Sequence, residues 1–177
     1  MLPLDAEHFL RPVRLGDGAA LARAYAANRE HLAPWEPLRI PEFFSAAWQE
    51  SDVRQCVAEE AAGRSRRFVI ESVDGEIRGR INLNNIVRGA CWSADLGYWI
   101  DHSLLRRGFA SQGVRQIAAF ARDELRLHRL QAATLVHNIA SQRVLADCGF
   151  ERIGLAPRYL RIAGEWQDHV LFQLLLE

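Results

Sequence analysis

The spacing of apolar residues divides this chain into helical and extended segments. Apolar positions that recur every three or four residues predict helices over 18–30, 51–62, 110–125 and 138–148. Short continuous or alternating apolar runs predict strands over 9–14, 67–73, 77–87, 91–100, 129–136, 150–162 and 165–176. The proline-rich segment 31–44 fits neither pattern, and we expect it to be a loop that exposes Trp35.

Turn and cap residues agree with these boundaries. Asp17 is expected to cap the first helix through its side chain, and Gly149 to end the last one. Asp74–Glu76 and Ala163–Gly164 are expected to be hairpin turns. A strand–helix–strand–helix run between two antiparallel meanders predicts an α/β protein: a single-layer, mixed, mostly antiparallel sheet of about seven strands with about four helices, all in one domain over 1–177.

The strand at 77–87 alternates with a period of two. Odd-numbered residues from Ile77 to Leu83 should face one side, and even-numbered residues from Arg78 to Asn84 the other. We expect Arg78 and Arg80 to be in solvent on the polar face; the alternative is that they meet an acidic peptide.

Composition narrows the class of protein. The formal net charge is zero, which gives no reason to expect nucleic acid or an anionic membrane as a partner. No segment reaches the length of a membrane span, and the amino terminus does not resemble a secretory signal. Three scattered cysteines predict reduced thiols in the cytoplasm, and neither they nor the histidines have metal-ligand spacing, so we expect no metal. The chain lacks lysine, through genomic base composition or because lysines would acylate themselves.

The stretch "LLRRGFASQG" runs from the end of a strand into a helix. Unpaired amides at a helix start favour phosphate groups, and Gly108 and Ala110 keep the backbone accessible. Ser111 adds a hydroxyl, while Arg106 and Arg107 can form bidentate phosphate contacts. The stretch predicts either a phosphate-binding loop or a plain strand-to-helix turn.

A second helix start follows in "HNIASQRVLADCGF". Asn138 and Ser141 are three residues apart and therefore share one face of the first turn. Asn138 alone is typical of an N-cap. Two successive strand–helix units, however, direct their helix N-termini to one edge of the sheet, where ligands of open α/β sheets bind.

Together "ADLGYWIDHSLLRRGFASQG", "HNIASQRVLADCGF" and "YLRIAGEWQDHVLF" resemble the GNAT superfamily of acyl-CoA-dependent N-acetyltransferases, in particular the ribosomal-protein-alanine N-acetyltransferases. The resemblance covers nearly the whole chain. It implies a splayed pair of central parallel strands, acetyl-CoA as co-substrate and a homodimer. The family's pyrophosphate loop matches 105–110; Leu105 departs from its first position, and Arg106 stands where glycine is frequent. The implied acetyl-CoA-binding residues are Trp99, Ile100, Arg106, Arg107, Gly108, Phe109, Ala110, Ser111, Asn138 and Arg143.

The resemblance also implies direct attack of an amine on the thioester, without an acyl-enzyme. Ser141 would protonate the departing thiolate, and Tyr98 and its neighbours would hold the thioester oxygen through their backbone. Asp95 is the candidate base, acting through water, or a polar residue of an open sheet face. The reserve candidates for the base are Glu165, Asp168 and His169. Cys148 ends an apolar helix and is expected to be core.

The acceptor is the least constrained part. Asp168 and the aromatic residues Trp35, Trp92, Tyr159 and Trp166 are candidates to contact it. The favoured hypothesis is acetylation of the N-terminal α-amine of a protein. The alternatives are a small amine such as an amino acid, aminoglycoside or toxin, and a catalytically silent acyl-CoA-binding module. A dinucleotide-binding domain is disfavoured because its glycine fingerprint is absent.

Overall fold

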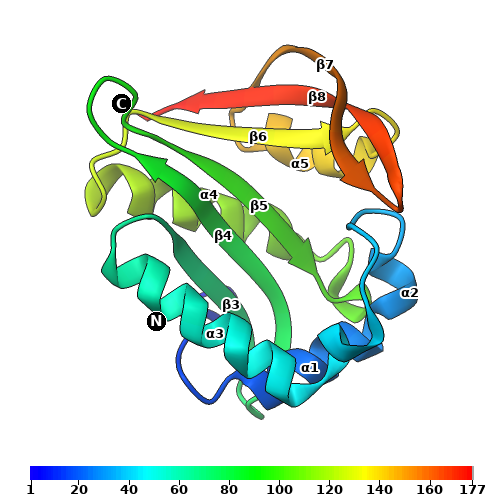
Figure 1. The fold of residues 1–177 in the computed structure, drawn as a ribbon. Coiled ribbons are helices and arrows are strands. Elements are labelled where there is room, and N and C mark those ends of the chain that lie inside the picture. Colours follow the sequence, from blue (N-terminus) through cyan, green and yellow to red (C-terminus); the bar gives the residue numbers. More distant parts are fainter. Residues whose placement is uncertain (177) are drawn as a thin grey trace.

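A computed structural model of the chain describes residues 1–176. One mixed sheet runs through this part, with strand order β1-β2-β3-β4-β5-β6-β8-β7 (Figure 1). Only β5 and β6 pair in parallel, and all other neighbours are antiparallel. The predicted fold class is confirmed.

The predicted strands are all present within residues 1–176. They are β2 (His8–Pro12), β3 (Arg66–Ser72), β4 (Ile77–Val87), β5 (Ser93–Ile100), β6 (Arg129–Leu135), β7 (Glu151–Ile162) and β8 (Glu165–Leu175). An eighth strand, β1 (Leu2–Pro3), pairs with β2 and was not expected. The turn at Ala163–Gly164 joins β7 to β8 with positive φ at both residues, as its hairpin requires.

The helices of this part are α1 (Gly18–Ala27), α2 (Arg29–Leu32), α3 (Ala46–Ala61), α4 (Phe109–Asp123) and α5 (Ile139–Asp147), with 3₁₀ turns at Pro41–Phe44 and His102–Leu104. Segment 31–44 is therefore not one continuous loop, since its last residues form a 3₁₀ turn. Helix α3 begins earlier than expected because the Ser45 side chain accepts the Trp48 N–H as an N-cap.

The sheet carries an apolar core on each face. Side chains from α4 and α5 pack on one face around Ile81, Leu130 and Phe172. Helices α1 and α3 cover the other face over β2 to β4 (Figure 1), around Val69 and Trp99. Only part of this second face is covered, because the two helices stop short of β6 and β8.

The expectation that the polar face of β4 lies in solvent is partly wrong. Arg80 is buried beneath α1 and α3, where it donates to the Tyr25 hydroxyl at 3.3 Å and pairs with Asp52 at 3.3 Å. Ile77 also lies on this face, not with Ile81, because the β3–β4 register shifts and skips one residue of β4. An alternating pattern does not reveal that helices cover the polar side.

Asp17 does not cap α1 with its side chain, which corrects a second expectation. Its carboxylate instead accepts two hydrogen bonds from Arg11 on β2, each 2.8 Å long. Both side chains are buried, so the acid joins the start of α1 to the sheet.

Candidate functional site

A fork opens between β5 and β6. The strands pair from Ser93↔Arg129 to Asp95↔Gln131, and no pair follows, although both continue. Residues 96–100 of β5 stay bound to β4 on their other side. This half of β5 is thus an unpaired strand edge inside the sheet, and its free backbone groups can bind an extended ligand.

Tyr98 lies in this fork and contacts α5. Its hydroxyl is 2.9 Å from the Ser141 Oγ. Burial raises the pKa of Tyr98 to about 12, although the hydrogen bond with Ser141 opposes the shift. The phenol therefore stays protonated at neutral pH and can donate a hydrogen bond. The structure brings these two predicted catalytic residues together.

Trp99 and Ile100 are available to a ligand only through their backbone. Both side chains are buried, and the Trp99 Nε1 donates to the Tyr25 hydroxyl at 3.2 Å on the α1 face. Asn138 caps α5 by accepting the Ser141 N–H with its Oδ1 at 3.1 Å. Its side-chain amide NH₂ group is not used by this cap.

The loop before α4 presents a row of free amides. Within the described chain, none of the N–H groups from Arg106 to Ser111 has a hydrogen-bond acceptor, and the first engaged amide is that of Gln112, bound to the Gly108 carbonyl at 2.9 Å. Gly108 has φ of 81° and Arg106 has φ of 59°. Free backbone N–H groups in a turn before a helix, next to residues with left-handed φ, are a type of site that binds anions.

The side chains around this loop differ in their exposure. Arg106, Arg107 and Arg143 are exposed, and Arg107 is 3.7 Å from Asp5. Phe109 is buried with an edge contact to His8, so only its backbone faces a ligand. Ala110 and Ser111 are half-buried in the first turn of α4.

Two buried residues that the sequence did not indicate hold this loop in place. Asp101 accepts hydrogen bonds from the Asn28 side chain at 2.9 Å and from the Ser103 N–H at 2.8 Å. Burial alone would raise the pKa of Asp101, but these hydrogen bonds outweigh it and the pKa lies below its ordinary value. The Asn28 Oδ1 in turn accepts the His102 N–H at 2.8 Å. The end of α1 is thereby fixed to the end of β5.

Asp95 lies at the closed end of the fork. It is half-buried, accepts a 2.8 Å hydrogen bond from the Asn85 side chain, and points to the face opposite to that of Tyr98, because odd and even residues of a strand alternate. Three residues of strand span about 10 Å. Asp95 is therefore not in the immediate surroundings of the Tyr98–Ser141 pair.

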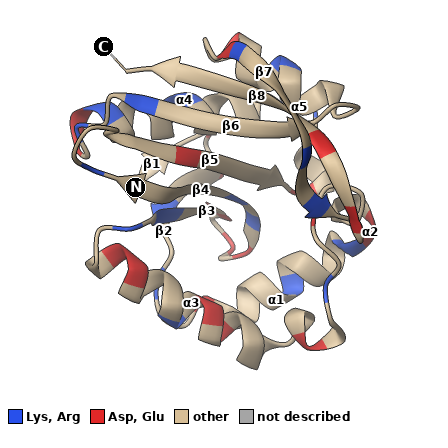
Figure 2. Cartoon of the chain, turned by 45° about the horizontal axis from the view of Figure 1, so that its top comes forward, with Lys and Arg blue, Asp and Glu red and all other residues tan. Residues whose placement is uncertain are grey.

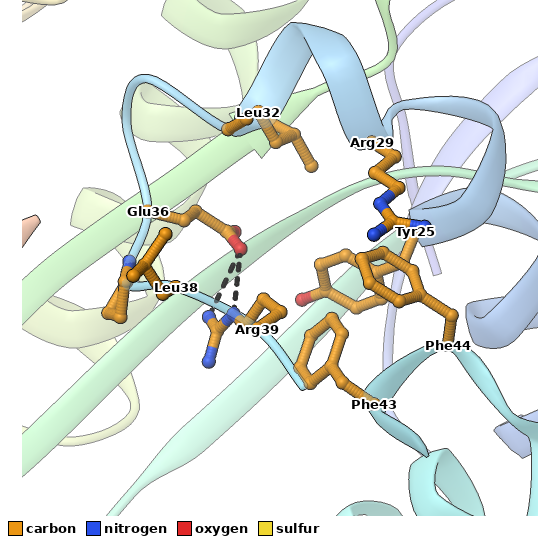
Figure 3. A pocket seen from close by; sticks show the side chains of 10 residues that line it. Tyr25, Arg29, Leu32, Glu36, Leu38, Arg39, Phe43 and Phe44 are labelled. Carbon is orange, nitrogen blue, oxygen red and sulfur yellow. Dashed lines mark hydrogen bonds and ion pairs between the residues drawn. The ribbon is translucent and has the colours of Figure 1, made fainter. Parts of the chain in front are cut away.

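A cavity of about 160 Å³ lies beneath segment 32–44. Tyr25, Phe43 and Phe44 form an aromatic wall, and Glu36 pairs with Arg39 across it at 3.1 Å (Figure 3). The Tyr25 hydroxyl connects this wall to Trp99 of β5. The two arginines of the cavity lie over its rings, Arg29 over Phe44 at 4.7 Å and Arg39 over Phe43 at 4.3 Å.

The expected acceptor residues are only partly brought together. The Trp35 ring is 5.6 Å from the ring of His137, which precedes α5. The β7–β8 turn contacts the segment that carries Trp35, because the Ala163 N–H donates to the Glu36 carbonyl at 3.0 Å. Trp166 is exposed in the hairpin.

Asp168 and Trp92 are engaged elsewhere. Asp168 accepts the Arg158 N–H at 2.8 Å, within the β7–β8 hairpin. Trp92 precedes β5, and its carbonyl accepts the His128 and Arg129 amides. Because the fork opens only beyond Asp95, Trp92 lies at the opposite end of β5 and is not part of this site.

The reserve candidates do not form a second catalytic group. His169 is buried, with its Nδ1 2.9 Å from the Gln167 carbonyl, and Glu165 is exposed at the end of the hairpin. Burial raises the pKa of the Cys148 thiol, which donates to the Ser111 carbonyl and packs against the core. Cys148 thus stays a thiol at neutral pH.

The described residues contain neither a cluster of metal-ligating side chains nor a helix that could span a membrane. Residues 1–176 contain no group of three or more His, Cys, Asp or Glu side chains close enough to hold a metal ion. No helix described in the structure is long and apolar enough to cross a membrane. In the view of Figure 2, acidic and basic residues are intermixed over the helices and the β7–β8 hairpin.

The chain is similar to known proteins over most of its length. Residues 8–151 match the family described as "Acetyltransferase (GNAT) domain". The chain is 33% identical over 169 residues to the [ribosomal protein uS5]-alanine N-acetyltransferase of Escherichia coli, covering 93% of this chain and 86% of that protein. The solved ribosomal-protein-S5-alanine acetyltransferase from Vibrio fischeri superposes with a TM-score of 0.92 at 29% identity and covers 98% of both chains. RimJ of Mycobacterium smegmatis, solved in complex with CoA-disulfide, has a TM-score of 0.90 at 36% identity, with 95% of this chain and 81% of that chain covered.

Proposed function

This chain belongs to the GNAT acetyltransferase family and is an acyltransferase, and on that premise we propose that it transfers the acetyl group of acetyl-CoA to the N-terminal α-amine of a protein. We treat the whole chain as one such domain. The observation that carries the proposal is the fork between β5 and β6. The Tyr98–Ser141 pair lies in this fork, and the loop with the free amides follows β5 and leads into α4.

The residues of the fork suit the parts of acetyl-CoA in turn. The amides from Arg106 to Ser111 would bind the pyrophosphate, with Arg106, Arg107 and Arg143 as exposed cations nearby. The unpaired edge of β5 at residues 96–100 would bind the amide groups of the pantetheine arm, as a strand binds a neighbour. Asn138 has a free NH₂ group at the start of α5 for the same arm. A relative was solved with CoA-disulfide bound, which supports this assignment.

The proposed reaction is direct acyl transfer. The amine nitrogen attacks the thioester carbon, the C–S bond breaks, one proton leaves nitrogen and one reaches sulfur. Backbone N–H groups of 98–100 would stabilise the oxyanion, and the Tyr98–Ser141 pair would donate a hydrogen bond to the departing sulfur. A Tyr98 pKa of about 12 makes full proton loss to a thiolate unfavourable. The pair therefore stabilises the thiolate. Sulfur takes a proton from solvent, relayed through Ser141, and the proton released from nitrogen returns to solvent, so no net proton is gained or lost.

The acidity of the acceptor favours an α-amine. Reference pKa values are about 7.8 for an α-amino group and about 10.4 for lysine. Deprotonating lysine at neutral pH therefore costs about 3.5 kcal/mol more. Asp95 is the carboxylate at the fork, on the opposite face from Tyr98, and would remove the proton through water. A site with so indirect a base suits an amine of which an appreciable fraction, roughly 15–30% between pH 7.0 and 7.5, is already neutral.

The surface beside the fork supports a peptide acceptor. The cavity under 32–44 and the tip of the β7–β8 hairpin lie side by side, joined by the bond from Ala163 to Glu36. Trp35 and Trp166 lie on these two segments. We propose that Glu36 and the aromatic wall contact the first residues of a protein acceptor. A ribosomal protein is the acceptor of the relatives from Escherichia coli and Vibrio fischeri.

An acceptor panel tests the proposal. The protein is incubated with acetyl-CoA and with peptides that have free N-terminal Ala, Ser or Met, N-blocked lysine peptides, free amino acids and aminoglycosides, and products are identified by mass spectrometry. We expect acetylation of the free peptide N-termini only. Acetylation confined to small amines would contradict the protein acceptor, and binding of acetyl-CoA with no product from peptides or from folded ribosomal proteins would indicate a silent binding module.

The Tyr98–Ser141 pair makes a kinetic prediction. Ser141→Ala should lower kcat about 10- to 100-fold, at or below the lower limit of the roughly 10²–10⁴-fold that full general acid catalysis contributes, and change the Kd for acetyl-CoA less than threefold. Tyr98→Phe should lower kcat similarly, and the double variant should lose little more, because the two hydroxyls act together. Steady-state kinetics and calorimetry measure both quantities. Unchanged kcat in Ser141→Ala would remove this hydroxyl from the mechanism.

A further inference from the structure

Thr134 lies on β6 in the open part of the fork. The last paired residues are Asp95 and Gln131, and Tyr98 and Thr134 each follow three positions later on their strands. Because parallel strands advance equally per residue, the two side chains lie at the same level on opposite sides of the fork. The two side chains also point to the same face of the sheet. Tyr98 packs against the core under α4 and α5. Thr134 points to the same face as Ala132, two residues earlier on β6, and as its strand partner Val170, and both of these belong to that core.

The Thr134 hydroxyl is buried without a partner. The residue is 5% exposed, and its Oγ1 has no hydrogen bond within the part of the chain that the structure describes. Its surroundings on this face are apolar, including Ala132 and Val170. A buried hydroxyl without a partner destabilises the folded chain, and valine would fill the same space without that cost.

The position of the hydroxyl indicates what would satisfy it. The proposed function places the acyl-pantetheine arm in this fork, where carbonyl oxygens are the acceptors that a hydroxyl can reach. On the opposite side, Tyr98 is already bound to Ser141. Thr134 is thus the hydroxyl within the described fork that has no protein partner.

We propose that the Thr134 Oγ1 donates a hydrogen bond to a carbonyl oxygen of the acyl-pantetheine arm and so fixes the thioester opposite Tyr98 and Ser141. This inference rests on the proposed use of acetyl-CoA. Thr134 is a binding residue for the donor substrate from the β6 side, whereas β5 holds the arm through its backbone. Its contact is with the donor alone, so it does not affect the acceptor.

Two matched variants test the role of this hydroxyl. Thr134→Val removes the hydroxyl and keeps the shape, and Thr134→Ser keeps the hydroxyl. We expect Thr134→Val to weaken acetyl-CoA binding about 3- to 10-fold, the effect of one hydrogen bond, and Thr134→Ser to stay within about twofold of wild type. The KM for acetyl-CoA should rise in Thr134→Val by a larger factor than kcat falls, with the acceptor KM nearly unchanged, as for a residue that contacts the donor alone.

Thermal unfolding without ligand separates binding from a structural role. If the hydroxyl is unpartnered in the free protein, Thr134→Val should have an unchanged or higher Tm. A lower Tm with unchanged affinity would overturn the proposal, as would equal acetyl-CoA affinity of Thr134→Val and wild type. If wild-type protein binds no acetyl-CoA, the proposed function fails and this inference fails with it; if wild type binds and the variant binds equally, only the role of Thr134 is wrong.

Discussion

Replacing Gly108 with valine will lower the affinity for acetyl-CoA at least about 100-fold while the chain stays folded. Gly108 has φ of 81°, a conformation that β-branched residues adopt only with strain. Relief of that strain would change the directions of the free amides between Arg106 and Ser111. Charge-assisted hydrogen bonds contribute about 1.5–3 kcal/mol each, so the loss of two corresponds to a factor of about 100 or more.

A second glycine provides the matched control. Gly89, in the turn between β4 and β5, has φ of 70° and open space where a Cβ would lie. The space at Gly108 is nearly as open, because only the end of the Gln112 side chain is near. Gly89→Val should therefore impose a similar strain, about 1–2 kcal/mol of unfolding free energy, at the far end of β5. Calorimetric titration with acetyl-CoA and urea unfolding of both variants measure the two effects.

Comparing the two valine variants tests whether the loop before α4 binds the phosphate groups of acetyl-CoA. We expect both variants to lose about the same free energy of unfolding, and only Gly108→Val to lose affinity for acetyl-CoA. If Gly108→Val binds acetyl-CoA as wild type does, the loop before α4 is an ordinary turn. If Gly89→Val loses affinity equally, the effect belongs to general destabilisation.

Replacing Arg11 with methionine will lower the free energy of unfolding by about 3–5 kcal/mol near pH 7.5. The Arg11 guanidinium lies between two buried acids, 2.5 Å from Glu71 and 2.8 Å from Asp17. Without it, two carboxylates remain buried with only the exposed Arg14 nearby, 3.5 Å from Glu71. The exposed pair of Arg23 and Glu76 is the control, and Arg23→Met should cost less than about 1 kcal/mol.

The cost of losing Arg11 should shrink in acid. The hydrogen bond from Arg11 lowers the pKa of Glu71 despite burial. In the wild type, this contribution to stability is fully present above the ordinary glutamate pKa of about 4.3 and is lost as pH falls through the lower folded value. In Arg11→Met, burial without a cation favours the protonated acid, so protonation relieves the destabilisation. Urea unfolding near pH 7.5 and near pH 4.5 should show a smaller difference at the lower pH, and a constant difference would refute the electrostatic account.

Local residue patterns were sufficient to predict most helices, strands and turns. The positions of Val114, Ile117 and Ala121 at helical spacing are all buried on one face of α4. Ala163–Gly164 and Gly149 adopt the positive φ that their turns need. These features depend on a few consecutive residues, because backbone sterics and side-chain period act over one or two turns of chain.

The partners of polar residues could not be predicted in this way. Arg80 lies on the polar side of an alternating strand, yet α1 and α3 cover it. Asp17 has the residue type of an N-cap, yet it is bound by a buried arginine of β2. Period two separates the faces of a strand but carries no information on what packs against each face.

The arrangement of the site likewise depends on contacts between distant segments. Asn28 is bound to Asp101, 73 positions away, and Tyr98 to Ser141, 43 positions away. Trp92 and Tyr98 are on one strand, yet the point where β6 stops pairing leaves only Tyr98 in the fork. Sequence spacing specifies which residues share an element, whereas strand register and helix packing determine which elements meet. The fork between β5 and β6 is a product of that register, and so is the position of Thr134 opposite Tyr98.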